Sequence, residues 1–363
     1  MKRHGVVGFV VLSALNLILL ACGSGGAVPP PVAIAYVAHS QSHSLSVINI
    51  PANKTVSTIQ IGNSSSGSLT MIPSYPTGVA VTPDGSRTYI TDGSTSVWIV
   101  DTGSNSVIGK IATGSTPEGI AIAPDGKRAY VTSINCGLLL CSGPGNPPQL
   151  ASVEVIDTVS NSLTATITIG NTPNGQSPGV LLSGIAISPD GTRAYVSDAV
   201  GNQIWAIDTA SNQVVATIPT TVSSLIGVSI SPDGSRLYAA SAGNPSIVDV
   251  IDTKTGHVVT SIALPGFDNP SRIAVTPDGG HVYVTGDSGH AWVVDTTTNM
   301  TVATVPISVG SPLLGIAFTP DGTRAYITCG NKDTIYVLDI MTYRILDRVP
   351  SPYPGGLAIA RSR

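Results

Sequence analysis

Charged residues are scarce in this chain. Only 10% of its 363 residues are Asp, Glu, Lys or Arg, and the formal net charge is −4. Proteins that bind nucleic acids neutralise backbone phosphates with clustered Lys and Arg side chains, and this sequence has no such run. The composition therefore argues against a nucleic-acid partner.

Sequence motifs of common catalytic chemistries are also missing. There is no Cys-x-x-Cys-His haem attachment, no P-loop, no Gly-x-Ser-x-Gly nucleophile elbow and no His-Glu-x-x-His zinc motif. Helical periodicity of apolar residues is absent beyond the first twenty residues. Because Val, Ile, Thr, Gly and Pro are abundant instead, we expect an all-β protein of short strands and tight turns.

The N-terminus has the organisation of an export signal. Lys2 and Arg3 precede an apolar segment, residues 5–20, which is too short for a comfortable membrane span. Residues 19–22 read Leu-Leu-Ala-Cys, which resembles the lipobox of bacterial lipoproteins, where the Cys is acylated. The resemblance implies a signal peptide over residues 1–21 and lipidation of Cys22. The Gly/Pro-rich composition of residues 22–32 predicts a tether.

The same resemblance implies a location. Inner-membrane lipoproteins usually carry an Asp after the acylated Cys, and this chain has Gly23 there. We therefore expect a lipid-anchored protein of the cell envelope, held at the outer membrane, on its periplasmic or surface side, if the host has two membranes. A plain secretory signal with a chance Cys is the alternative.

A repeated phrase organises the rest of the chain. Pro-Asp-Gly, followed closely by a basic residue and Tyr, begins at Pro83, Pro124, Pro189, Pro232, Pro277 and Pro320. A second apolar run then ends in Asp101, Asp157, Asp208, Asp252, Asp295 or Asp339. With Tyr36, seven tyrosines mark units that repeat every 41–45 residues, apart from two longer intervals. Four short strands per unit predict a seven-bladed β-propeller over residues 33–363.

The two ends of the predicted propeller complement each other. The chain enters inside a unit, at the strand of Tyr36, so its first unit lacks an inner strand. Residues 354–360 match the first strand of the other units, such as residues 117–123. We therefore expect the C-terminal strand to complete the first blade and to close the ring, which leaves no open blade edge.

The units also resemble a known propeller repeat. Residues 130–132, Tyr-Val-Thr, together with residues 155–158, Val-Ile-Asp-Thr, are similar to the Tyr-Val-Thr-Asn (YVTN) repeat of surface-layer-type and exported proteins. The resemblance covers roughly residue 33 to the C-terminus and implies an exported propeller. His39 and His43 stand where that pattern has Asn, and we expect them in a solvated loop.

A basic residue follows each Pro-Asp-Gly turn at a fixed distance. It is Arg in five units and His281 in the sixth. If the second and third strands form a hairpin, Arg87 lies near Asp101, and the pairing recurs in the other units. We interpret the pairs as ion pairs that hold each blade together. A basic ring for binding anions is the alternative.

Three long insertions interrupt the repeat. The strand order assigns all of them to the face opposite the Pro-Asp-Gly turns: residues 63–75, 133–151 and 171–183. Loops on a rigid scaffold are frequent binding sites, so we take this face as the candidate partner-binding face.

The largest insertion contains two of the four cysteines. Cys136 and Cys141 are predicted to form a local disulfide in an oxidising compartment. The three residues at the tip of this insertion either cover the channel mouth or dock a partner: Leu138, Leu139 and Leu140. Cys329 has no evident partner and is expected to be a small buried residue.

Candidate catalytic groups at the channel mouth are few. His39, Asp92 and Asp198 end second strands and are expected to ring the partner-binding face, while Glu118 opens an inner strand at the channel. Lactonase-type propellers use calcium held by several carboxylates and amides at such a mouth. We expect no cofactor here; a divalent metal near Glu118 is the alternative.

The tryptophans occupy one position of the repeat. Trp98, Trp205 and Trp292 each stand three residues before the strand-end Asp. Because the position repeats, we expect these side chains to pack between blades rather than to stack on sugars.

Together these observations favour a binding protein. We expect a monomeric, lipid-anchored, non-enzymatic propeller that binds a protein or glycan of the cell envelope. An envelope hydrolase of the lactonase type, or an oxidoreductase, that uses the channel mouth is the alternative. An enzyme of that kind needs several convergent polar groups at the mouth, and the sequence supplies few.

Overall fold

The computed structural model describes most of the predicted propeller. The described residues are 33–39, 41–62, 78–134, 151–170, 180–221, 224–266 and 268–361. The following predicted features lie outside the described residues: the signal peptide, Cys22, the tether, the Cys136–Cys141 disulfide, and Leu138, Leu139 and Leu140.

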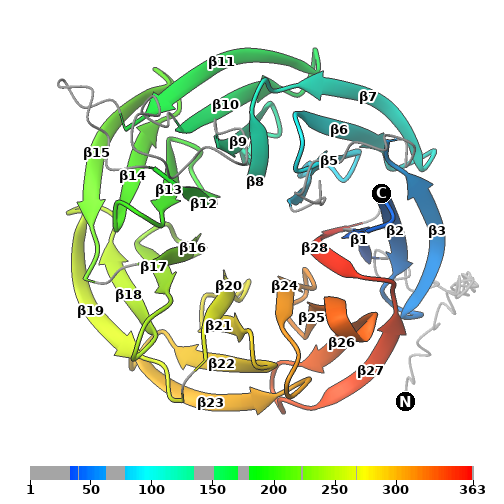
Figure 1. The fold of residues 1–363 in the computed structure, drawn as a ribbon. Coiled ribbons are helices and arrows are strands. Elements are labelled where there is room, and N and C mark those ends of the chain that lie inside the picture. Colours follow the sequence, from blue (N-terminus) through cyan, green and yellow to red (C-terminus); the bar gives the residue numbers. More distant parts are fainter. Residues whose placement is uncertain are drawn as a thin grey trace, which may run out of the picture. The chain divides into compact units, whose positions relative to one another are not determined.

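The described chain forms seven four-stranded antiparallel sheets, which are the blades of a ring (Figure 1). Blade 1 contains β28 (Pro354–Arg361), β1 (Ala33–His39), β2 (Ser44–Asn49) and β3 (Lys54–Gln60). Blade 2 contains β4 (Val79–Val81), β5 (Arg87–Thr91), β6 (Ser96–Asp101) and β7 (Ser106–Ala112). Blade 3 contains β8 (Thr116–Ile122), β9 (Arg128–Ile134), β10 (Ala151–Asp157) and β11 (Ser162–Ile169).

The other four blades keep the sequence order of their strands from the channel to the rim. Blade 4 contains β12 (Leu182–Ile187), β13 (Arg193–Asp198), β14 (Gln203–Asp208) and β15 (Gln213–Pro219). Blade 5 contains β16 (Leu225–Ile230), β17 (Arg236–Ser241), β18 (Ile247–Asp252) and β19 (His257–Ala263). Blade 6 contains β20 (Pro270–Val275), β21 (His281–Gly286), β22 (His290–Asp295) and β23 (Met300–Pro306). Blade 7 contains β24 (Leu313–Phe318), β25 (Arg324–Cys329), β26 (Thr334–Asp339) and β27 (Ile345–Pro350).

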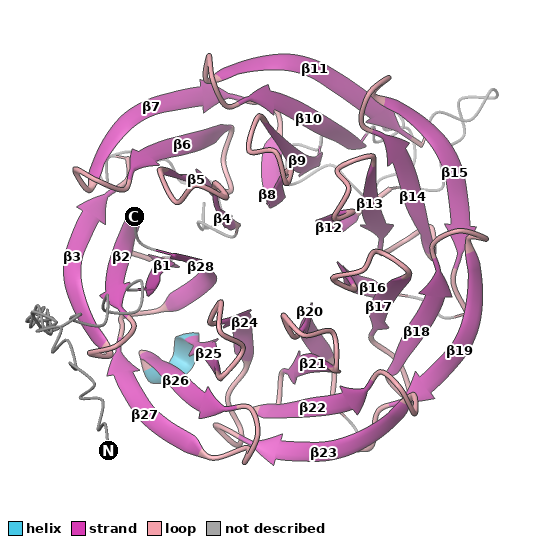
Figure 2. Ribbon diagram, turned by 180° about the vertical axis from the view of Figure 1, so that it is seen from behind, coloured by secondary structure: helices cyan, strands magenta, loops and turns pink. Residues whose placement is uncertain are grey.

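This arrangement confirms the predicted all-β propeller and its closure. β28 pairs antiparallel with β1, with Tyr36 opposite Ala358 and Ala35 opposite Ile359. Within the described residues the sole helix is the 3-10 turn η1 (Gly330–Lys332), which Figure 2 shows between β25 and β26. The described residues therefore contain no helix that is long and apolar enough to cross a membrane.

The Pro-Asp-Gly motif forms a turn that is stabilised by its own residues. In blade 2, Asp84 Oδ1 accepts a hydrogen bond from the Thr82 hydroxyl at 2.6 Å, and the Gly85 N–H donates to the Thr82 carbonyl at 2.8 Å. Gly85 has φ +69°, a left-handed conformation that a glycine adopts without strain. The turn then directs the chain into the second strand.

The core lies between the blades. Seven clusters of buried apolar side chains each combine residues of two neighbouring blades, such as Leu45 with Ile90. The repeated Tyr adds a polar link across this interface, because its hydroxyl reaches the outer turn of the next blade. Tyr89 donates to Asn161 Oδ1 at 2.7 Å, and Tyr326 donates to the Ile50 carbonyl at 3.2 Å across the closure of the ring.

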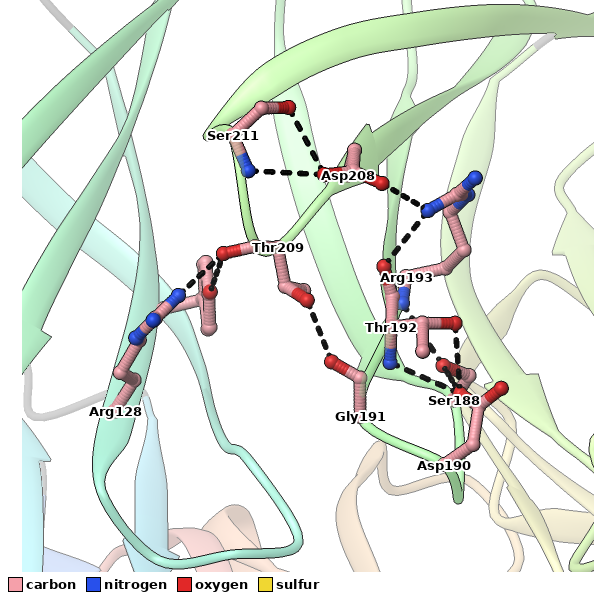
Figure 3. Close-up of polar contacts among 10 residues, drawn as sticks. Arg128, Ser188, Asp190, Gly191, Thr192, Arg193, Asp208, Thr209 and Ser211 are labelled. Carbon is pink, nitrogen blue, oxygen red and sulfur yellow. Dashed lines mark hydrogen bonds and ion pairs between the residues drawn. The ribbon is translucent and has the colours of Figure 1, made fainter.

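The predicted Arg–Asp pairs are confirmed in two blades and replaced in two others. Arg193 forms an ion pair with Asp208 and Arg236 with Asp252, and because both pairs are partly exposed to solvent, each adds little to stability. Arg128 instead donates to the Thr209 carbonyl of the next blade (Figure 3), and Arg87 likewise donates to the Thr158 carbonyl. In these blades the guanidinium links neighbouring blades, which the sequence spacing did not show.

Candidate functional site

The inner strand of each blade lies toward the centre of the ring (Figure 1), where residues of all seven blades line a central channel. Its described walls enclose a cavity of about 200 Å³. Six blades contribute a glycine at the same inner position: Gly78, Gly119, Gly184, Gly227, Gly315 and Gly356. Blade 6 contributes Arg272 at this position. The inner wall therefore combines glycine backbone with aliphatic side chains such as Ile120, Ile185 and Leu357.

Close approach of the inner strands explains several of these glycines. A Cβ added at Gly78 would lie 2.6 Å from the Glu118 carbonyl oxygen, and one added at Gly315 would lie 2.8 Å from the Gly355 carbonyl oxygen. Such distances leave no room for a side chain unless a strand moves. The repeat thus keeps glycine where neighbouring inner strands nearly touch.

A hydroxyl on the second strand completes this inner position. The Gly78 N–H donates to Thr91 Oγ1 at 2.7 Å, and the Thr91 hydroxyl donates to the Glu118 carbonyl of blade 3 at 2.8 Å. At the closure of the ring, the Thr328 hydroxyl donates to the Gly355 carbonyl at 2.7 Å. The hydroxyl therefore joins one inner strand to the next around the channel.

Two charged side chains line the described channel. Glu118 comes from β8 in blade 3 and Arg272 from β20 in blade 6. The surrounding walls desolvate the guanidinium and lower the pKa of Arg272, while the Glu118 carboxylate opposes that shift. The prediction that Glu118 faces the channel is confirmed. Arg272 was missed, although aligning the inner strands of the seven repeats shows it in a column of glycines.

The residues that end the second strands do not form an accessible ring. All seven are buried: His39, Asp92, Ser133, Asp198, Ser241, Gly286 and Cys329. The expectation that His39, Asp92 and Asp198 line an accessible binding face is therefore corrected by their burial. Cys329 is a free, buried thiol, as predicted.

The two aspartates hold the turns that follow them. Asp92 Oδ1 accepts from the N–H groups of Ser94 and Ser96 at 2.9 and 3.0 Å, and its Oδ2 accepts from Trp98 Nε1 at 3.0 Å. Asp198 repeats the arrangement in blade 4, with Trp205 Nε1 3.3 Å from Oδ2. Both carboxylates thus satisfy buried donors of their own blades.

His39 is also structural, contrary to the predicted solvated loop. Its Nδ1 donates to the Pro352 carbonyl at 2.5 Å, and its Nε2 accepts from the Ser46 hydroxyl at 2.7 Å. Burial lowers the pKa of His39, although the bond to Pro352 opposes the shift. The neutral ring fixes the segment that leads from blade 7 into β28.

We predict a pH-dependent contribution of His39 to stability. The unfolded pKa is near 6.5 and the folded pKa is lower, so the unfolded chain binds the proton more strongly. The contribution is fully present above pH 6.5 and is lost as the pH falls toward the folded pKa. Chemical denaturation at several pH values should show a shallower loss for His39→Gln than for the wild type. Parallel curves for the two proteins would contradict the prediction.

The position three residues before the strand-end Asp anchors the segments between blades. The Trp292 Nε1–H donates to the Pro265 carbonyl at 2.9 Å, so the packing prediction for this tryptophan is confirmed. Where other blades lack Trp, carboxylates serve the same purpose. Glu154 Oε1 accepts from the Ser115 hydroxyl at 2.8 Å, and Asp249 Oδ1 accepts from the Thr221 hydroxyl at 2.7 Å. Burial raises the pKa of Glu154.

Because these carboxylates accept hydrogen bonds within the scaffold, few acidic side chains remain that could bind a metal ion. Within the described residues, no three His, Cys, Asp or Glu side chains lie close enough together to hold a metal ion. Glu118 is the one acidic side chain on the described channel wall. The donor set of the described mouth therefore does not fit the several carboxylates of a calcium-dependent lactonase site.

The fold and this channel define the class of the protein as a seven-bladed β-propeller with a narrow, nearly neutral channel. A protein family described as "SMP-30/Gluconolactonase/LRE-like region" matches residues 174–288. No curated protein sequence matches the chain.

Several solved structures resemble the whole propeller. A chain of hydrazine synthase from Kuenenia stuttgartiensis is 26% identical, with a TM-score of 0.65 over 81% of this chain and 92% of its own. A functionally unknown protein from Desulfotomaculum acetoxidans DSM 771 is 16% identical, with a TM-score of 0.70 over 91% and 99%. The dihydro-heme d1 dehydrogenase NirN is 16% identical, with a TM-score of 0.61 over 90% and 74%. The last two show a common fold.

Proposed function

We propose that the protein is a lipid-anchored, non-enzymatic propeller that binds a protein or glycan of the cell envelope. The position of the longest connections supports the proposal. They join β3 to β4, β9 to β10 and β11 to β12, and each leaves the ring at the face opposite the Pro-Asp-Gly turns. On a rigid scaffold, such a concentration of loop sequence on neighbouring blades favours recognition.

The chemistry of the described mouth supports binding over catalysis. The buried carboxylates of Asp92, Asp198, Glu154 and Asp249 accept hydrogen bonds from turns and interblade segments. They are therefore committed to the scaffold, and a catalytic site would need convergent groups that remain accessible.

The location rests on the lipobox resemblance at Cys22 and on the YVTN-like repeat. Acylation would hold the propeller at the membrane through the tether of residues 22–32. Membrane fractionation tests this part. We expect Cys22→Ser to move the protein from the membrane fraction to the soluble fraction, and retention in the membrane would contradict lipid anchoring.

Affinity capture from envelope extract tests the binding function. The bait is the full-length protein in detergent, and in three variants residues 63–75, 135–149 or 171–179 are replaced by a short Gly/Ser linker. We expect the wild type to capture a partner and at least one of these variants to lose most of it. Lys127→Ala and Lys254→Ala change exposed side chains on the opposite face and are the matched controls. Equal capture by all the variants would contradict the proposal.

An enzyme of the lactonase or oxidoreductase type is the second candidate. The match of residues 174–288 to the gluconolactonase-like family favours it, as does the likeness to propellers of hydrazine synthase and NirN. Metal analysis of the purified protein, with lactone hydrolysis assayed in the presence of calcium, separates the candidates. A stoichiometric metal with hydrolysis would support the enzyme and would overturn the binding proposal.

A further inference from the structure

Arg272 stands at the inner-strand position where the other repeats have the least room for a side chain. The other six blades place glycine there, and the inner strands of several blades leave no space for even a Cβ. The crowding is less where blade 5 faces blade 6. On the neighbouring blade, a Cβ added at Gly227 would meet nothing closer than Ile273 Cγ2 at 3.6 Å, an ordinary contact. The inner strands of blades 5 and 6 therefore leave more room between them than the crowded pairs of blades do.

Blade 6, which has Arg272 in place of glycine, also has a buried hydroxyl without a hydrogen-bond partner among the described residues. Thr285 pairs with Arg272 in the register of β20 and β21, at the position held by Thr91 in blade 2 and Thr328 in blade 7. The hydroxyls of Thr91 and Thr328 are hydrogen-bonded, whereas the buried hydroxyl of Thr285 has no partner among the described residues. An unpaired buried hydroxyl is destabilising. Blade 6 thus loses stability where it places an arginine in the channel.

The guanidinium is available to a ligand. The Arg272 side chain has exposed surface in the channel, and its one side-chain hydrogen bond among the described residues runs from Nη1 to the Ser271 carbonyl at 2.9 Å. None of the ion pairs among the described residues includes it. A planar guanidinium with free donors binds carboxylates in a bidentate geometry. The carboxylate of Glu118 lines the same cavity from blade 3.

We propose that the channel binds a compact zwitterion, whose carboxylate pairs with Arg272 and whose ammonium group faces Glu118. The two opposite charges stand in a cavity of about 200 Å³ whose other described lining residues are uncharged. Glu118 repels multiply charged anions and attracts a cationic group, so a molecule with both charges is the better match. The volume suits a molecule of amino-acid size. The proposal is independent of the partner-binding function.

Isothermal titration of the full-length protein in detergent tests the site. The probes are glycine, β-alanine and γ-aminobutyrate, which differ in charge separation, with acetate and ethylammonium as singly charged controls. We expect one zwitterion to bind at least about tenfold more tightly than either control. Arg272→Gly should weaken that binding by at least about tenfold, and Glu118→Gln should also weaken it.

The variants distinguish a loss of zwitterion binding from a loss of folding. Arg272→Gly restores the residue of the other six blades, so it should fold and melt at no lower temperature than the wild type. Arg272→Lys keeps the positive charge but lacks the planar pair of N–H donors that binds a carboxylate in a bidentate geometry, so it should bind with intermediate affinity. Lys127→Ala, on the opposite face, should bind like the wild type. Absence of zwitterion binding, unchanged binding by Arg272→Gly, or tighter acetate binding by Glu118→Gln would overturn the proposal.

Discussion

Removal of residues 354–363 is expected to abolish cooperative folding of the propeller. These residues include β28, which provides the inner strand of blade 1 and pairs with β1 along most of its length. Leu357 and Ile359 also pack against the apolar cluster between blades 7 and 1. Their loss would expose the edge of β1 and one wall of that cluster at once, and exposed strand edges promote aggregation.

Thermal unfolding by circular dichroism and size-exclusion chromatography would measure the effect. We expect the truncated protein to lose its unfolding transition or to aggregate, because the lost strand pairing and apolar contacts reduce a net stability that is only roughly 5–15 kcal/mol for a typical domain. A protein that lacks only residues 362–363 is the control and should unfold like the wild type. A truncated protein with an unchanged transition would show that the ring does not need the closing strand.

Asp198→Ala is expected to be the most damaging single substitution among the predicted site residues. Asp198 is fully buried, and its Oδ1 accepts from the N–H groups of Val200 and Gly201 at 3.2 and 2.9 Å. Oδ2 lies 3.4 Å from Gln203 Nε2 and 3.3 Å from Trp205 Nε1. Alanine would leave several buried donors without an acceptor. We expect a loss of about 3–5 kcal/mol in the free energy of unfolding.

Urea denaturation would measure the change, with Asp233→Ala as the matched control. Asp233 is an exposed carboxylate in a Pro-Asp-Gly turn, and hydrogen bonds from Ser231 and Ser235 lower its pKa to about 2. Since this turn is at the surface, its substitution should cost about 1 kcal/mol or less. If Asp198→Ala were as stable as the wild type but failed to capture the partner, the carboxylate would belong to a binding site instead.

The fold could be predicted because its signals are local and repeat along the chain. A Pro-Asp-Gly turn needs only its own residues, and Gly85 adopts the left-handed φ wherever the turn forms. Seven tyrosines then count the blades. The closure also followed from sequence, since residues 354–360 carry the pattern of an inner strand that the first unit lacks.

The site was less predictable because burial depends on neighbouring blades. The sequence placed Asp198 and His39 correctly at the ends of second strands, and wrongly on an accessible face. His39 is covered because it bonds to Pro352, which is 313 residues away in the chain. Arg128 likewise reaches Thr209 of the next blade instead of its own strand-end Asp. Such partners have no fixed spacing from the residue that they contact.

The number of blades, the turns between strands and the strand that closes the ring can be read from the sequence, because each depends on residues that are close in the chain or repeat in it. Which polar groups hold the scaffold together and which face the channel depends on contacts between blades that are distant in the chain. Glu118 and Arg272 lie on inner strands of different blades, and they meet in one cavity because the ring brings those strands around a common centre. The negative charge of Glu118 and the positive charge of Arg272 therefore share a cavity because the ring is closed.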